Sequence, residues 1–150
     1  MPHNRTLKHE FFTDLRVGKL QFGDRLLFAG LWTLADRDGR LKEQPGEFLR
    51  KLMPYNPDYD ISDALVRLHD ANLITRYQIH GEFHIQIRNW LKHQNPHHTE
   101  VSRNIPAPEG YVPYKKPENY GEFQNPNSRV GNSPLPNGEN LKEKKESKWR

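Results

Sequence analysis

Apolar residues are densest between Leu26 and Ala35, where eight of ten positions are apolar. Such a run is too short to cross a bilayer. A helix that is apolar on nearly every side is one that other elements surround. Asp24 can accept hydrogen bonds from first-turn N–H groups, and Gly39 is the residue type that often ends a helix. We therefore expect a central helix within Asp24–Leu41, with the following chain folded over it.

Shorter helical patterns lie on both sides of this run. A helix is expected over Pro45–Met53, because proline suits a first helical turn and the apolar residues fall on one face. Another is expected over Asp60–Asn72, where Asp60 can act as the N-cap. Its apolar positions have the spacing of one buried face: Ile61, Ala64, Leu65, Leu68 and Ala71. Thr13 is expected to cap a short helix that continues through Leu20.

Leu73–Arg88 is expected to form a β-hairpin around Gly81, because apolar and polar residues alternate after that glycine. Two registers are open. A two-residue loop would pair Ile79 with Glu82, and a three-residue loop would pair Ile79 with Phe83. Burial of one face normally fixes the register, so we favour the three-residue loop, which keeps apolar residues together. That register turns five polar side chains outward: Arg76, Gln78, His84, Gln86 and Arg88.

Composition divides the chain. Apolar residues make up only 33% of the sequence, and residues 106–150 hold 7 of the 12 prolines. We expect a basic N-terminal arm over residues 1–10, a folded domain over 11–95, and a polar Pro/Asn/Lys-rich tail over 96–150 that is largely disordered.

Charge and cysteine content restrict the function only weakly. The formal charge is +4, with 15 basic against 13 acidic residues in 1–105 and 8 against 6 in 106–150. A strong nucleic-acid binder usually has a more one-sided field. The chain has no cysteine, which excludes disulfides and thiolate zinc sites. It shows no signal peptide and no transmembrane run, so we expect a cytoplasmic protein with no membrane contact.

The order of expected elements is helix, short extended piece at Gly39–Lys42, helix, turn, helix and hairpin. This order predicts an α+β fold, a winged helix-turn-helix with a three-helix core and a two-stranded β-hairpin wing, followed by a disordered tail. Such a domain places its last helix in the DNA major groove and lets the wing contact the backbone or minor groove. Here those parts would be Asp60–Asn72 and Leu73–Arg88.

Several stretches together resemble a known family. They are RTLKHEFFT, RLLFAGLWTLADRDGRL, the Pro–Tyr turn, LxxLxxANLI, GEFHIQI, NWLKHQNPHHTE and NIPAP, and they cover roughly residues 4–108. They resemble small phage and prophage winged-helix replication proteins, related in domain type to the N-terminal domains of replisome organisers and DnaD-type primosome proteins. The resemblance implies DNA binding in phage replication initiation within a bacterial host cell. The tyrosines and basic residues of the tail favour recruitment of a replication partner such as a helicase or its loader, and a homo-oligomer is a further expectation.

If the domain binds double-stranded DNA, the polar and basic side chains of the arm, the helix-turn-helix and the wing are the candidate contacts. Asp63 and Asp70 oppose this on the expected recognition helix, because base readout relies on Arg, Asn and Gln. A helix that serves as scaffold or as a protein contact is therefore an equal alternative. The candidate DNA-binding residues are Arg5, Lys8, Arg50, Lys51, Ser62, Arg67, His69, Arg76, His84, Gln86, Arg88 and Lys92.

We predict no enzyme activity, no cofactor and no metal site. His93, His97, His98 and Glu100 are close in sequence and invite a metal interpretation, but Pro96 interrupts them and no distant acidic cluster is evident. A flexible polar segment, or histidine side chains packed against the body, is the better interpretation. Three hypotheses follow: a DNA-binding winged helix, a winged-helix protein-interaction or transcription-regulatory module, and a metal-dependent nuclease as the weakest.

Overall fold

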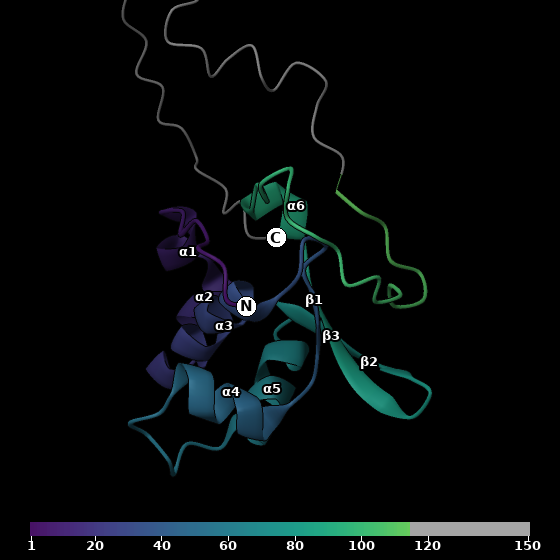
Figure 1. The fold of residues 1–150 in the computed structure, drawn as a ribbon. Helices are drawn as coiled ribbons and strands as arrows, with labels where there is room; N and C mark the ends of the chain where they lie inside the picture. Colours follow the sequence, from purple (N-terminus) through teal and green to yellow (C-terminus); the bar gives the residue numbers. More distant parts are fainter. Residues whose placement is uncertain (115–150) are drawn as a thin grey trace, which may run out of the picture.

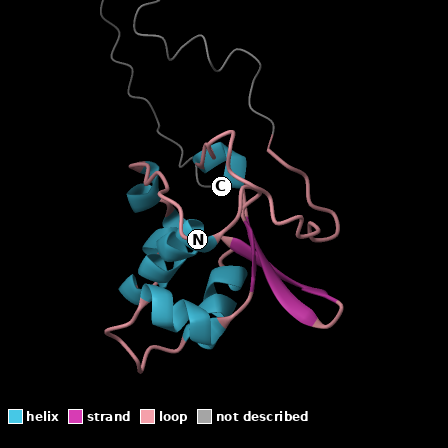
Figure 2. Cartoon of the chain, viewed as in Figure 1, coloured by secondary structure: helices cyan, strands magenta, loops and turns pink. Residues whose placement is uncertain are grey.

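The computed structural model describes residues 1–114, which form an α+β fold with six helices and a three-stranded antiparallel sheet. The helices gather on one side of the sheet (Figures 1 and 2). No helix within this range has the length and apolarity needed to cross a membrane. The part of the expected tail at 115–150 lies outside the described residues.

Helix α3 (Phe22–Leu34) is the centre of the helical layer. Leu27, Phe28 and Leu31 are almost fully buried, but Leu26 is 60% exposed, so the helix is not covered on every side as we expected. The helix ends at Leu34, and Gly39 lies in the turn that follows rather than at the helix end. The central helix is confirmed, with one face open to solvent.

Asp24 and Gly39 have roles other than those expected. Asp24 is fully buried in the first turn of α3 and contacts Tyr59 and Arg67 instead of capping the helix. Gly39 has a φ of +74°, and a Cβ at this position would lie 2.5 Å from the Trp90 ring. Both the backbone conformation and the space under Trp90 therefore require glycine.

Two one-turn helices precede α3. Helix α1 is Glu10–Thr13 and helix α2 is Leu15–Gly18. The expected N-cap, Thr13, is wrong by one residue. The N-cap of α2 is Asp14, whose side chain accepts hydrogen bonds from the N–H groups of Arg16 and Val17. Phe11 attaches this segment to the core, since its ring lies edge-on to Trp32 with centroids 5.6 Å apart.

Helices α4 (Pro45–Leu52) and α5 (Ile61–Asp70) confirm the two predicted amphipathic helices to within two residues at each end. Asp60 is the N-cap of α5, and its side chain accepts a hydrogen bond from the N–H of Asp63. The predicted apolar face of α5 is buried at Ile61, Ala64, Leu65 and Leu68. A last short helix, α6 (Trp90–His93), follows the sheet.

The sheet consists of β1 (Arg40–Lys42), β2 (Ile74–Ile79) and β3 (Glu82–Ile87), in the order β1-β3-β2. The predicted three-residue loop is wrong, because Ile79 pairs with Glu82 and Gln78 with Phe83. His80 and Gly81 both have positive φ, the conformation of a two-residue type I′ hairpin turn. Turn geometry therefore fixes the register here.

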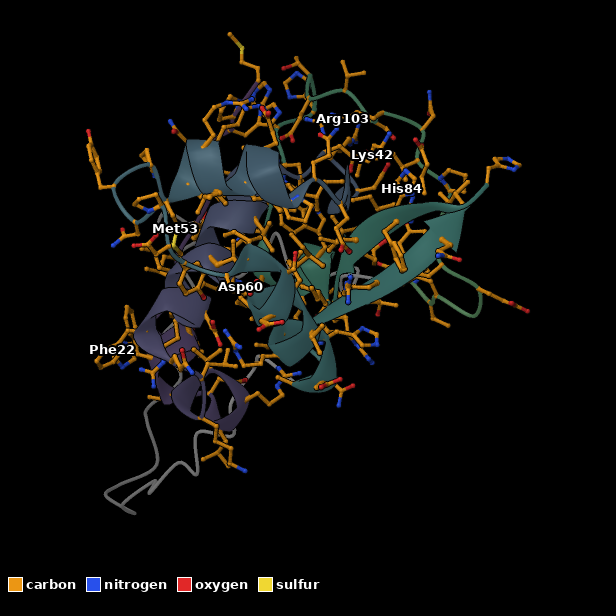
Figure 3. The ribbon with its side chains drawn as sticks, turned by 90° about the horizontal axis from the view of Figure 1, so that it is seen from below. Phe22, Lys42, Met53, Asp60, His84 and Arg103 are labelled. Atoms are coloured by element: carbon orange, nitrogen blue, oxygen red, sulfur yellow. The ribbon has the colours of Figure 1, made fainter. Side chains whose placement is uncertain are left out.

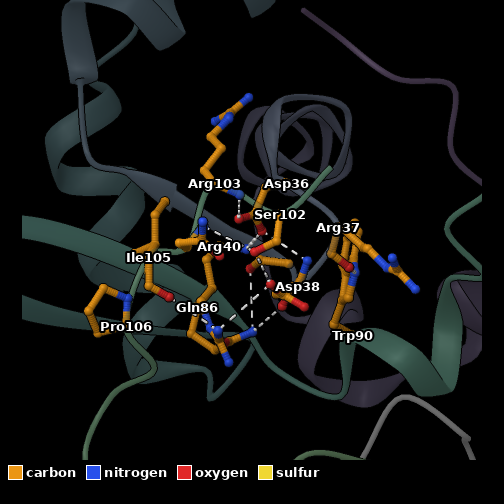
Figure 4. A network of polar contacts seen from close by, with 12 residues as sticks. Asp36, Arg37, Asp38, Arg40, Gln86, Trp90, Ser102, Arg103, Ile105 and Pro106 are labelled. Carbon is orange, nitrogen blue, oxygen red and sulfur yellow. Dashed lines mark hydrogen bonds and ion pairs between the residues drawn. The ribbon is translucent and has the colours of Figure 1, made fainter. Parts of the chain in front are cut away.

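The alternation in β3 misled the prediction because both faces of this central strand are covered. Ile85 and Ile87 pack in the core, while Gln86 is fully buried and His84 is nearly so on the other face. Figure 4 shows how Gln86 is satisfied: its amide donates to the Asp38 carbonyl at 3.1 Å and accepts from Arg40 at 2.6 Å. The expected outward orientation of His84 and Gln86 is therefore wrong.

The segment after α6 covers this second face. The Tyr77 hydroxyl donates to the Pro106 carbonyl at 2.8 Å, and Arg40 donates to the Ile105 carbonyl at 3.1 Å. Ser102 and the Arg103 N–H bind the turn before β1 through Asp38 and Asp36 (Figure 4). We call residues 102–111 the strap. We expected the folded domain to end at residue 95, but the strap lies beyond that boundary and packs on the folded domain.

Candidate nucleic-acid interface

Helix α5 does not present its arginine to a ligand. The Arg67 guanidinium forms a two-pronged ion pair with the buried Asp24 carboxylate, at 2.7 and 3.0 Å, and the Tyr59 hydroxyl donates to the same carboxylate. Burial raises the pKa of Asp24, but the bonds from Arg67 and Tyr59 outweigh it, so this pKa lies below its usual value. Asp24 is therefore ionised and holds Arg67 against α3.

What α5 does present is acidic. The Asp63 and Asp70 side chains are exposed, and so is the N-cap Asp60. Ser62 and His69 of our candidate residues lie on the same exposed face, where His69 Nδ1 accepts from the Arg76 backbone N–H at 3.2 Å. An acidic helix repels phosphates and has few of the donors that read base edges.

The β2–β3 hairpin, which is the expected wing, offers little more. Arg76 is tied to Glu43 by two hydrogen bonds of 2.8 and 2.6 Å and lies over the Phe83 ring, 5.2 Å from its centroid. His84 and Gln86 are buried under the strap. Arg88, at the far end of β3 from the wing tip, is the only candidate wing residue of those proposed that is largely exposed. The tip of the hairpin therefore carries no cation from our list.

Arg50 and Lys51 lie in the last turn of α4, and both contact Glu47 in the first turn of that helix. These exposed ion pairs contribute little stability, so both cations can exchange Glu47 for another anion. They form a small basic site beside the acidic turn that leads to α5.

The N-terminal arm packs on the body instead of extending into solvent. The Arg5 side chain is 5% exposed, donates to Glu100 and to the carbonyls of Trp32 and Ala35, and lies over the Trp90 ring. Arg5 thus ties the arm to the segment before the strap. Its distant partner, Glu100, gave no local signal in the sequence.

A basic edge is formed where the arm, α2 and α6 meet. Lys8 donates to the Lys92 carbonyl at 3.0 Å. Arg16 donates to the Asn72 carbonyl at 3.3 Å, and Arg88 reaches the Asn72 side chain at 3.5 Å. Three residues from our candidate list, Lys8, Arg88 and Lys92, are thereby brought together. We define the basic edge by six residues: Lys8, Arg16, Lys19, Arg25, Arg88 and Lys92.

His93 is buried beneath the basic edge, and the positive charge of the edge affects the pKa of its imidazole. Burial, and to a smaller extent the positive charges of Lys8, Lys92 and Arg16, lower the pKa of His93 to about 4. The imidazole is therefore neutral at pH 7. Sequence reasoning missed Arg16 in α2, Lys19 directly after α2, and Arg25 near the start of α3.

The histidine-rich segment is not assembled into a metal site. Glu100 is paired with Arg5, His93 is buried, and His97 Nδ1 lies 2.7 Å from the Thr99 hydroxyl. Within residues 1–114, no group of three or more His, Cys, Asp or Glu side chains is placed to hold a metal ion.

No family model, curated protein or solved structure matches this chain. The proposals below therefore rest on the geometry of the described residues.

Proposed function

We propose that this protein is a DNA-binding winged-helix protein of the phage or prophage type that acts in replication initiation. The winged-helix part of the proposal is supported by the order of elements α3-β1-α4-α5-β2-β3 together with the sheet order β1-β3-β2. The phage-replication part rests on the resemblance of residues 4–108 to that family. A helix-turn-helix pair followed by a hairpin, with the short strand beside the last strand, is the arrangement of a winged helix. The role is one of binding, with double-stranded DNA and a replication protein as the partners.

A titration of fluorescent duplex DNA tests this proposal, because phosphate contacts make binding dependent on salt. With about five such contacts, the affinity should fall by about 10²- to 10³-fold between 50 and 200 mM salt. The full chain and fluorescence anisotropy suffice for the measurement. If no binding is detected at 50 mM salt, the proposal fails.

A second candidate function is a protein contact made by α5, in the host cytoplasm. It is favoured by one specific observation: Arg67 is held by Asp24, while Asp60, Asp63 and Asp70 remain exposed. An acidic helix face suits a basic protein partner better than DNA. Capture from a host lysate with wild-type chain and with Asp63→Arg/Asp70→Arg separates the two, since a partner that uses α5 is lost only with the variant.

A further inference from the structure

Two phenylalanine side chains are exposed on either side of α2, and we call the surface around this helix the corner. Phe22, the first residue of α3, is 81% exposed, and Phe12 in α1 is 65% exposed. Figure 3 shows Phe22 projecting from the start of α3, on the side of the molecule away from Lys42 and His84. Single exposed apolar residues are ordinary, but these two flank the same short helix, α2.

Cations lie between and beside these rings. The Arg25 guanidinium lies over the Phe22 ring, 4.9 Å from its centroid. Arg25 also donates to the carbonyls of Gly18 and Leu20, at 2.8 and 3.1 Å, which holds the start of α3 against the end of α2. Lys19, which stands between Gly18 and Leu20 in the sequence, has an exposed side chain.

The positive charge continues from this corner along the basic edge, through Arg16 to Arg88. The acids inside the corner are turned inward: Asp14 caps α2 and pairs with Arg16, and Asp24 is buried against Arg67. With these two acids turned inward, the charges that this surface presents are those of its cations.

We propose that this corner binds single-stranded nucleic acid, with bases stacked on Phe12 and Phe22 and phosphates held by Lys19, Arg25 and the rest of the basic edge. Aromatic faces can stack only on unpaired bases, and cations interleaved with exposed aromatics form the usual platform for a single strand. This inference rests on the proposed function and names the strand type and the surface. It moves the contact away from α5.

Fluorescence anisotropy with a labelled 20-nucleotide oligo(dT) and with a duplex of the same length tests the proposal on the full chain. Phe12→Ala and Phe22→Ala should each weaken oligo(dT) binding by about tenfold, because each removes one stacking face. Tyr55→Ala is the matched control, since Tyr55 is 93% exposed in the turn after α4. Thermal unfolding of each variant checks that the fold is intact.

The charge component has its own test. Lys19→Gln should make the slope of log affinity against log salt shallower by about 0.7 for the single strand. Lys42→Gln on β1 is the matched control, because Lys42 is an exposed lysine paired with Glu82 and lies on the side of the molecule away from Phe22 (Figure 3), so it should leave the slope unchanged.

The outcomes distinguish the two proposals. Wild-type chain that does not bind duplex overturns the proposed function. Wild-type chain that binds duplex but not oligo(dT) overturns only this inference. Wild-type chain that binds DNA while Phe12→Ala and Phe22→Ala bind oligo(dT) normally overturns only this inference. Equal losses with Tyr55→Ala also overturn it, because the effect would then not belong to this corner.

Discussion

The exposed face of α5 and the corner around α2 each contain charged residues of both signs in the sequence, yet they present opposite signs. On α5 the arginine is turned inward and the aspartates point to solvent. At the corner Asp14 and Asp24 are turned inward, and the cations point outward. One ion pair, Asp24 with Arg67, contributes to both, because it removes an acid from the corner and a cation from α5.

The comparison shows why a formal charge of +4 says little about partners. The sign of a surface depends on which member of each pair is buried, and a count over the chain averages the two regions. A nearly neutral body can therefore carry a one-sided field at one corner.

Removing Arg67 should have the largest effect. In Arg67→Met the Asp24 carboxylate remains fully buried with only Tyr59 to stabilise it, because a buried charge without its partner is strongly destabilising. We expect the free energy of unfolding to fall by about 3–4 kcal/mol in urea titrations. Arg88→Gln, at an exposed position, is the control and should change it by less than about 0.5 kcal/mol. Equal effects would mean that Asp24 is solvated and that the two regions are not linked.

His93 should make stability fall in mild acid. Its pKa is lowered to about 4 in the folded protein, against an ordinary value of 6.5. The unfolded chain therefore binds the proton first as the pH drops below 6.5, and stability declines towards pH 4 by up to about 3 kcal/mol. Urea titrations of wild type and His93→Gln at pH 7, 6, 5 and 4.5 measure this. The variant should lose most of the decline, and His97→Gln should retain it.

Sequence patterns predicted the local elements well, because local signals specify them. Proline at the start of α4, the Asp60 cap of α5 and the apolar spacing of both helices depend on neighbours within a few positions. The hairpin register was wrong because alternation in β3 does not show that the strap covers its second face. Only the Tyr77 and Arg40 contacts to Pro106 and Ile105 reveal that cover.

The candidate site was harder to predict, since whether each cation is free to bind a ligand depends on an acidic residue far away in the sequence. Arg5 is bound by Glu100, Arg67 by Asp24 and Arg76 by Glu43. Nothing near these arginines in the sequence marks them as internal. The corner was missed for the converse reason: α1 and α2 are each one turn long, and their pattern is too short to show a face.

A smaller effect tests whether the strap covers the sheet face beneath it. A covered face could not serve as a third nucleic-acid-binding surface. Tyr77→Phe removes the hydrogen bond to the Pro106 carbonyl and should lower the free energy of unfolding by about 1 kcal/mol. Hydrogen exchange of the β3 amides should become faster at the same time. Unchanged exchange would indicate that the strap does not protect this face.

The smallest effect on stability gives the sharpest test of the comparison. Asp63→Asn removes a favourable charge from the first turn of α5, and Asp70→Asn removes an unfavourable charge from its last turn. Because the two effects oppose each other, the double variant should change the free energy of unfolding by less than about 0.5 kcal/mol. If nucleic acid binds at the corner, its affinity for oligo(dT) and duplex should change by less than about twofold, because neither aspartate belongs to the corner or the basic edge and 0.1 M salt weakens the effect of exposed charges that do not contact the ligand. If α5 instead enters a groove, removing two negative charges should strengthen duplex binding several-fold and leave oligo(dT) binding unchanged. Anisotropy titrations of the double variant at 100 mM salt therefore decide which of the two regions faces DNA.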